Sequence, residues 1–178
     1  MRGALALRRL STRAADDAWK LTHVGSDGSP RMVDVGNKQV TRRSATARST
    51  IRLPPAVLLE LQRVGGEQLV GPKGPISTTA TIAGVMGAKS TSSLLPFCHP
   101  LPLENCQVQL HVVAPDAIHV ECKVQVTHKT GVEMEALTGA SVAALCVYDM
   151  CKALSHEIVI EDTRLVDKSG GKRDFSSK

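Results

Sequence analysis

An acid and a base lie three residues apart near the end of the most apolar stretch of the chain. Residues 135–154 read EALTGASVAALCVYDMCKAL, and their charged side chains are Glu135, Asp149 and Lys152. At about 100° per residue, a helix places Asp149 and Lys152 on one face and Glu135 about 40° from Asp149. Because burying an unpaired charge is costly, we expect a partner or a shifted pKa. The spacing fits an acid–base pair that does chemistry, or a solvated ion pair near a helix end.

Further candidates lie in loops that contain proline or glycine. His99 in PFCHP suits acid–base chemistry or phosphate binding, or is an ordinary loop histidine, and Cys98 beside it has no second metal ligand at a recognised spacing. Lys73 in GPKGP and Lys168 in KSGGK can present a cation and backbone N–H groups to phosphate, although each also fits a solvated loop lysine. Together these groups suit the turnover of an anionic, phosphorylated small molecule.

The elements that must position these residues follow from the hydrophobic periodicity. A short helix over 54–64 is predicted from its two leading prolines, and the glycine-rich residues 65–75 after it are predicted to be a loop. The remaining order is strand, helix, strand, strand, helix, strand, over residues 40–53, 76–95, 107–113, 117–126, 130–154 and 156–166.

This order predicts an α+β fold of the ferredoxin-like βαββαβ type, with two helices on one face of an antiparallel sheet. Thr130 and Glu133 fit a capping box, which would start the long helix at Thr130. Gly84 and Gly87 lower helix propensity but permit close approach of another backbone. The tail after residue 166 is predicted to be polar and contains glycine. No linker marks a second domain, so residues 21–178 are predicted to form one.

The net charge of +5 is concentrated at the N-terminus. The first 14 residues hold four arginines and no acid, and without them 18 basic residues face 17 acidic ones. The nearly neutral remainder and only four aromatic residues argue against binding to nucleic acid. Residues 1–20 have the composition of an organellar transit peptide, with the mitochondrial matrix expected ahead of the plastid; a disordered basic tail is the alternative.

Hydropathy and the cysteine pattern argue against a membrane protein, a disulfide-rich protein and a zinc protein. No apolar run reaches the roughly 18 uninterrupted residues of a membrane span. The five cysteines, at 98, 106, 122, 146 and 151, form no CxxC pair. That count argues against a disulfide framework and a structural zinc site, and it favours a reducing compartment. We expect neither a metal nor another cofactor.

Four segments occur in a characteristic order: MVDV, PFCHPLPL, KTGVEMEALTGASVAALCVYDMCKAL and LVDKSGGKRDF. In this they closely resemble the MoaC family, the cyclic pyranopterin monophosphate synthases of molybdenum cofactor biosynthesis, over roughly Leu21 to Phe175. The resemblance implies conversion of 3',8-cyclo-7,8-dihydroguanosine 5'-triphosphate to cyclic pyranopterin monophosphate with release of pyrophosphate. It also implies a ferredoxin-like fold and a homohexamer of three dimers, with the site at a subunit interface.

The same resemblance implies roles for individual residues. Asp149 matches the catalytic acid–base residue and Lys152 its essential partner, buried against a neighbouring subunit. The positions that match substrate-binding residues are Lys73, Phe97, Cys98, His99, Glu133, Met134, Glu135 and Lys168. Lys73, Lys168 and His99 would hold the triphosphate and stabilise the departing pyrophosphate. Asp149 and Lys152 would move protons during the ring rearrangement, and Lys152 would need a depressed pKa to act as a base.

Three positions depart from the family pattern. Thr81 stands where an arginine is usual, Pro75 where an acidic or amide residue is usual, and Phe97 where leucine is commoner. They cluster around the loop and helix expected to meet phosphate. They leave open a non-catalytic paralogue that binds a nucleotide or pterin without turnover. An RNA-binding module of the same fold is disfavoured, because the strands lack stacking aromatics.

Overall fold

A computed structural model describes residues 22–177, and the chain divides into two compact units after Val33. In the described part of the first unit, Val24 and Pro30 form an antiparallel bridge, and the Gly25 N–H donates to the Ser29 carbonyl at 2.8 Å. The predicted transit peptide, residues 1–20, lies outside the described residues. That segment and the single domain over 21–178 therefore stay predictions.

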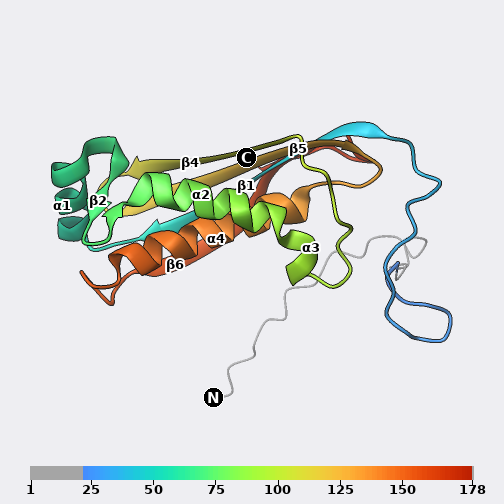
Figure 1. The fold of residues 1–178 in the computed structure, drawn as a ribbon, viewed down its shortest axis with the longest axis horizontal. Helices are drawn as coiled ribbons and strands as arrows, with labels where there is room; N and C mark the ends of the chain where they lie inside the picture. Colours follow the sequence, from blue (N-terminus) through green and yellow to red (C-terminus); the bar gives the residue numbers. More distant parts are fainter. Residues whose placement is uncertain (1–21, 178) are drawn as a thin grey trace, which may run out of the picture. The chain divides into compact units, whose positions relative to one another are not determined.

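The second unit contains one main sheet and two long helices (Figure 1). The helices are α1 Pro55–Gly65, α2 Ile76–Lys89, α3 Thr91–Leu94 and α4 Glu133–Cys151, with a 3-10 turn over Gly66–Gln68. The strands are β1 Thr41–Arg52, β2 Val70–Gly71, β3 Gly74–Pro75, β4 Asn105–Val113, β5 Ala117–His128, β6 Val159–Ser169 and β7 Phe175–Ser176.

The main sheet has the strand order β4-β5-β1-β6-β7, and each neighbouring pair is antiparallel. The long helices α2 and α4 lie side by side along the sheet (Figure 1). This arrangement confirms the predicted α+β, ferredoxin-like fold. Three short strands were not predicted: β2 and β3 form a small hairpin inside the glycine-rich loop, and β7 in the polar tail pairs with β6.

Two predicted helix ends differ from the structure. The helix expected to run to residue 95 ends at Lys89, and α3 follows as a separate turn. The capping box is wrong, because α4 begins at Glu133 with Val132 at the N-cap and no side-chain cap bond. The Glu133 carboxylate instead accepts a hydrogen bond from the Lys168 ammonium at 2.9 Å. The Glu133 side chain therefore pairs with Lys168 on β6 and does not cap the start of the helix.

The core lies between the helices and one face of the sheet. Alternation along β5 turns a full set of apolar side chains towards the helices, all with no exposed surface: Ile118, Val120, Cys122, Val124 and Val126. The matching positions on β1 are small, including Ala45, Ala47 and Ser49, so a helix can lie close to the sheet there. Among the described residues, α4 alone is long and apolar enough to cross a membrane. Half of its most apolar stretch is buried within the protein, as in a core helix.

Glycines set the distance between α2 and α4, as the sequence predicted. A Cβ atom added to Gly84 would lie 3.0 Å from the Gly139 carbonyl oxygen, and one added to Gly87 would lie 2.7 Å from Val142 Cβ. A Cβ added to Gly139 would lie 2.5 Å from the Cys122 sulfur and 3.1 Å from the Gly84 carbonyl oxygen. The two helix backbones and the sheet thus meet at Gly139 with no room for a methyl group.

Replacing Gly139 by alanine tests this packing. Alanine normally stabilises a helix interior by about 1 kcal/mol relative to glycine. Here we expect the opposite sign, a loss of about 1–3 kcal/mol in the free energy of unfolding, because the added methyl group overpacks the contact with Cys122. Urea denaturation measures the change.

The Cys122→Ala and double variants are the controls. Cys122→Ala removes the sulfur that contacts the new methyl group. The effects of the two substitutions on the free energy of unfolding should therefore be non-additive, and the double variant should regain part of the stability lost in Gly139→Ala. A Gly139→Ala protein as stable as the wild type would contradict the close approach.

Candidate active site

The first group of predicted site residues lies at the C-terminal end of α4. The Asp149 carboxylate bridges two ammonium groups there, with Lys73 Nζ 2.7 Å from Oδ2 and Lys152 Nζ 2.8 Å from Oδ1. All three side chains are about half exposed in this single chain. We call Lys73, Asp149 and Lys152 the C-terminal cluster.

Lys73 reaches this cluster because of the hairpin formed by β2 and β3, which lies near the C-terminal end of α4 (Figure 1). A Cβ on Gly71 would lie 3.7 Å from the Met150 carbonyl oxygen and 3.4 Å from Leu61 of α1. Gly74 closes the turn with a φ of 102°, a conformation that side chains other than glycine rarely adopt. The hairpin therefore delivers Lys73 from 76 residues away in sequence.

The charges of the C-terminal cluster shift one another's titration. Hydrogen bonds from Lys152 and Lys73 lower the pKa of Asp149 to about 2. The same Asp149 hydrogen bond raises the pKa of Lys152. The depressed pKa that Lys152 would need to act as a base is therefore absent from the single chain. At neutral pH the cluster holds one carboxylate and two cations, with a net charge of about +1.

A second group lies at the N-terminal end of α4, and we call Glu133, Glu135 and Lys168 the N-terminal cluster. Lys168 Nζ lies 2.9 Å from Glu133 Oε1, and both side chains are about two-thirds buried. Burial alone would raise the pKa of Glu133, but the Lys168 hydrogen bond, a backbone hydrogen bond and the charges of Lys168 and Arg43 together lower it. The ion pair joins the first turn of α4 to the end of β6.

Glu135 is the buried carboxyl group of the site, with only 4% of its surface exposed. Burial raises its pKa, and the nearby Glu133 charge adds to the effect. Cys98 lies within range of the same carboxyl: burial and the charge of Glu135 both raise the pKa of the thiol. Cys98 is therefore a neutral thiol, and its environment does not activate it as a nucleophile.

Phe97, Cys98 and His99 lie in the segment that follows α3, and Figure 1 shows α3 beside the N-terminal end of α4. His99 is half-buried, whereas Phe97 is partly exposed. Met134, in the first turn of α4, is also exposed. The PFCHP segment and the first turn of α4 thus belong to the same end of the unit.

The structure does not bring all the predicted site residues together. The sequence places Glu135 and Asp149 on nearly one helical stripe, but 14 residues of helix separate them by about 21 Å along the axis. One is buried and the other exposed, so lying near one stripe of the helix does not bring the two side chains together in one chain. The eight predicted substrate-binding residues and the predicted catalytic pair divide between the two ends of α4.

Two cations were not predicted as site residues: Arg43, near the N-terminal cluster, and Lys89 on α2. Arg43 on β1 influences Glu133, and its Nη1 would lie 3.2 Å from a Cβ on Gly171 in the KSGGK segment. Lys89 at the end of α2 lines a cavity beside Cys106. Strand alternation predicts that Arg42 and Arg43 point to opposite faces of the sheet. The sequence does not show which of the two faces Glu133. Thr81, a departure from the family pattern, donates to the Val108 carbonyl at 3.4 Å and so contacts β4.

No three His, Cys, Asp or Glu side chains within residues 22–177 are grouped so as to hold a metal ion. The chemistry that the two clusters can supply themselves is acid–base and electrostatic. Ammonium groups can bind phosphate oxygens, and carboxyl groups can exchange protons.

Comparisons with known proteins find one family and close relatives. A family model described as the MoaC family matches residues 32–171. A protein of Xanthomonas oryzae pv. oryzae named cyclic pyranopterin monophosphate synthase is 53% identical over 158 residues, covering 89% of this chain and 94% of that protein. Molybdenum cofactor biosynthesis protein 1 of Dictyostelium discoideum is 42% identical over 86% of this chain, which corresponds to 26% of that longer protein.

The titration of Asp149 tests the C-terminal cluster. Its carboxyl group should titrate at about pH 2 in the folded protein, well below the ordinary 3.8, when followed by the carboxyl carbon signal in NMR. Because the folded pKa lies below the unfolded one, the stability from these ion pairs is present above pH 3.8 and lost as the pH falls towards 2.

Lys152→Met and Lys73→Met should each raise the Asp149 pKa towards the ordinary value, because each removes a hydrogen bond to the carboxylate. Lys123→Met, on an exposed site of β5, is the matched control and should leave it unchanged. An Asp149 signal that titrates near pH 4 in the wild type would contradict the arrangement.

Proposed function

The chain belongs to the MoaC family, and we propose that it is a cyclic pyranopterin monophosphate synthase, a lyase of molybdenum cofactor biosynthesis. Its substrate would be 3',8-cyclo-7,8-dihydroguanosine 5'-triphosphate, and its products cyclic pyranopterin monophosphate and pyrophosphate. The observation that carries the proposal is 53% identity to a protein of that name along nearly the whole of both chains. The Asp149 carboxylate held between two lysines supplies acid–base groups suited to such a reaction.

The lysines of both clusters suit a polyanionic substrate. Lys73 and Lys168 each have a carboxylate partner, at 2.7 and 2.9 Å. Phosphate oxygens carry more charge and more acceptor positions than a carboxylate, so they can displace those partners. Lys73, Lys168 and His99 would then hold the triphosphate and stabilise negative charge on the departing pyrophosphate.

Substrate binding would also change what Asp149 can do. With a pKa of about 2, the Asp149 carboxylate paired with both lysines is a weak base. When phosphate oxygens take up Lys73, Asp149 loses one of the two lysine hydrogen bonds that lower its pKa, and it becomes a better proton acceptor. Lys152 is protonated, and the Asp149 carboxylate raises its pKa, so Lys152 holds its proton while that pair is intact. Once Asp149 has accepted a proton it no longer raises the pKa of Lys152, and we assign Lys152 the role of acid after Asp149 has acted as base.

An end-point assay on the purified chain tests the proposal. With the cyclised triphosphate as substrate, we expect pyrophosphate and cyclic pyranopterin monophosphate by mass spectrometry. Asp149→Asn should lower turnover by about 10²–10⁴-fold, the range expected for loss of an acid–base group. Asp162→Asn is the matched control, because it makes the same change on β6 at a carboxylate paired with Arg164.

The assay also distinguishes a synthase from a non-catalytic paralogue that binds the substrate without turnover. Wild-type protein that binds the triphosphate tightly but forms no product would sink the synthase and favour that paralogue. The departures at Thr81 and Pro75 motivate this arm of the experiment.

We further propose that each active site combines the two ends of α4 from different copies of the chain, as in a dimer within a hexamer of three dimers. In one chain the catalytic Asp149 and the buried Glu135 are about 21 Å apart along the helix, too far to meet one small molecule. Exposed apolar side chains on the helices offer a surface for a second copy: Ile82 and Met86 on α2 and Leu145 on α4. A second copy could bring the N-terminal cluster of one chain to the C-terminal cluster of the other.

Mixing two inactive variants tests this composite site. Asp149→Asn damages only the C-terminal cluster, and Glu135→Gln damages only the N-terminal cluster. After unfolding and refolding together, a random two-fold assembly leaves about a quarter of the sites with both clusters intact. We therefore expect the inactive variants to recover about a quarter of wild-type activity when refolded as a mixture.

The control is the same pair of variants refolded separately and mixed afterwards, which should stay inactive if the copies do not exchange. Absence of recovery from the refolded mixture, with the wild type regaining activity under the same protocol, would show that each site lies within one chain.

A further inference from the structure

Two cysteines of the sheet have sulfur atoms in contact, and the proposed reaction uses neither. Cys106 lies on β4 and Cys122 on β5, with 4.0 Å between the two Sγ atoms. The strand register pairs Cys106 with Val124 and Cys122 with Val108, so the cysteines are diagonal neighbours on one face of the sheet. That face is the one covered by the helices, since Cys122 would meet a Cβ on Gly139 of α4.

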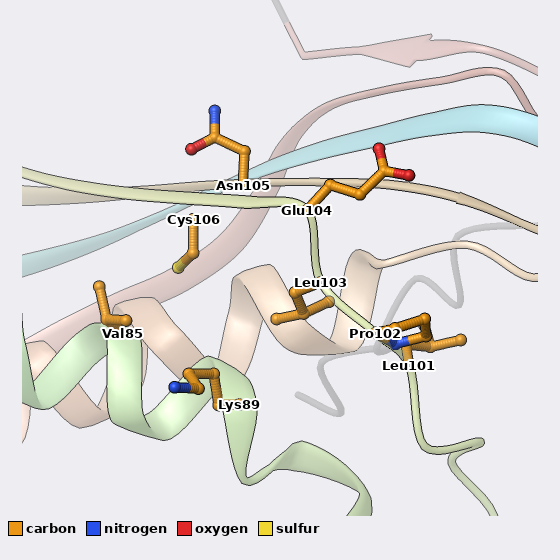
Figure 2. A pocket seen from close by; sticks show the side chains of 8 residues that line it. All are labelled: Val85, Lys89, Leu101, Pro102, Leu103, Glu104, Asn105 and Cys106. Atoms are coloured by element: carbon orange, nitrogen blue, oxygen red, sulfur yellow. The ribbon is translucent and has the colours of Figure 1, made fainter.

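Cys106 is accessible from a cavity, whereas Cys122 is not. The cavity, of about 410 Å³, is lined by Val85 and Lys89 of α2, by the chain that leads into β4, and by Cys106. Figure 2 shows the Cys106 side chain pointing from β4 towards the helices, on the side where Lys89 lies, while Asn105 points the other way. Cys122 lies with no exposed surface. A small solute can therefore reach the first sulfur and not the second.

Cys106 also has the most favourable surroundings for a thiolate among the five cysteines. The hydrogen bond with Cys122 lowers the pKa of Cys106, burial raises it, and the charge of Lys89 lowers it, with a net lowering. The other four thiols have a raised pKa, and burial contributes to each. Since the thiolate is the reactive form, Cys106 is the nucleophile of the pair and Cys122 its buried neighbour.

We propose that Cys106 and Cys122 form a redox-modification site, which a hydroperoxide oxidises to a reversible disulfide between β4 and β5. The Cys106 thiolate attacks the terminal peroxide oxygen; the S–O bond forms, the O–O bond breaks, and the released alkoxide takes a proton from water. The Cys122 sulfur then displaces hydroxide from the Cys106 sulfenic acid, and its proton leaves with that hydroxide as water. Two thiols lose two electrons, and the peroxide becomes an alcohol and water.

Bond formation requires the two sulfur atoms to approach by about 2 Å, to the disulfide length of roughly 2.0 Å. The movement falls to Cys106, because β4 is at the edge of the sheet and pairs on one side only with β5. Cys122 is fixed on the inner strand beneath Gly139. In a reducing compartment the pair rests as two thiols, and a dithiol reductant restores it after oxidation.

Peptide mapping of the oxidised full chain tests the proposal. The reduced protein is treated with hydrogen peroxide near neutral pH, and the remaining thiols are alkylated. We expect two of the five thiols to be lost and the protein mass to fall by two hydrogen atoms. Cleavage after glutamate separates the partners into peptides 105–121 and 122–133, which should remain linked until dithiothreitol is added.

Three variants distinguish the roles of the cysteines. Cys106→Ser should retain every remaining thiol, Cys122→Ser should accumulate a Cys106 sulfenic acid that dimedone traps, and Cys146→Ser should still give the linked peptides. The wild-type map needs no variant, so a misfolded variant cannot mask the answer. Retention of all five wild-type thiols, a linked peptide that contains another cysteine, or sulfenic acid without closure would overturn the proposal.

Discussion

The contact between α2 and α4 at Gly84 and Gly139 is the constraint on which the rest of the structure depends. The Gly139 position meets the Gly84 backbone on one side and the Cys122 sulfur on the other. This contact fixes the axis of α4 against both the neighbouring helix and the sheet. Both clusters lie at ends of that helix, so their separation and orientation follow from one closely packed crossing. Glycine has a low helix propensity, so this close contact is made at positions that weaken each helix locally.

The C-terminal end of a helix is an unfavourable place for a carboxylate, because the helix dipole is negative there. Asp149 lies two residues before the end of α4, and hydrogen bonds from the neighbouring lysines outweigh the effect of the dipole and lower its pKa. Lys152 belongs to the same turn, but Lys73 comes from the hairpin of β2 and β3. The hairpin therefore positions a cation and also helps to lower the pKa of the residue proposed to be catalytic.

The sequence predicted the fold well because strand alternation and apolar stretches are local properties. The sequence could not show features that depend on contacts between residues far apart in the chain. Glu133 looked like a capping residue, since its partner Lys168 is 35 residues away. The helical wheel placed Glu135 beside Asp149 because a wheel ignores the rise along the axis. The MoaC motifs named ten site residues, yet only the structure shows that a single chain separates them into two groups.

The charges of the two clusters explain why neither end of α4 alone suits the proposed substrate. The C-terminal cluster has two lysines against one aspartate, and so attracts phosphate. The N-terminal cluster has two glutamates against Lys168, and burial of Glu135 favours its protonated form. A buried carboxyl group suits the polar edge of a guanine-derived ring better than it suits a triphosphate. A molecule with both a ring and a triphosphate would therefore use both clusters, and because the rigid α4 holds them about 21 Å apart in one chain, the proposed active site joins clusters from two chains.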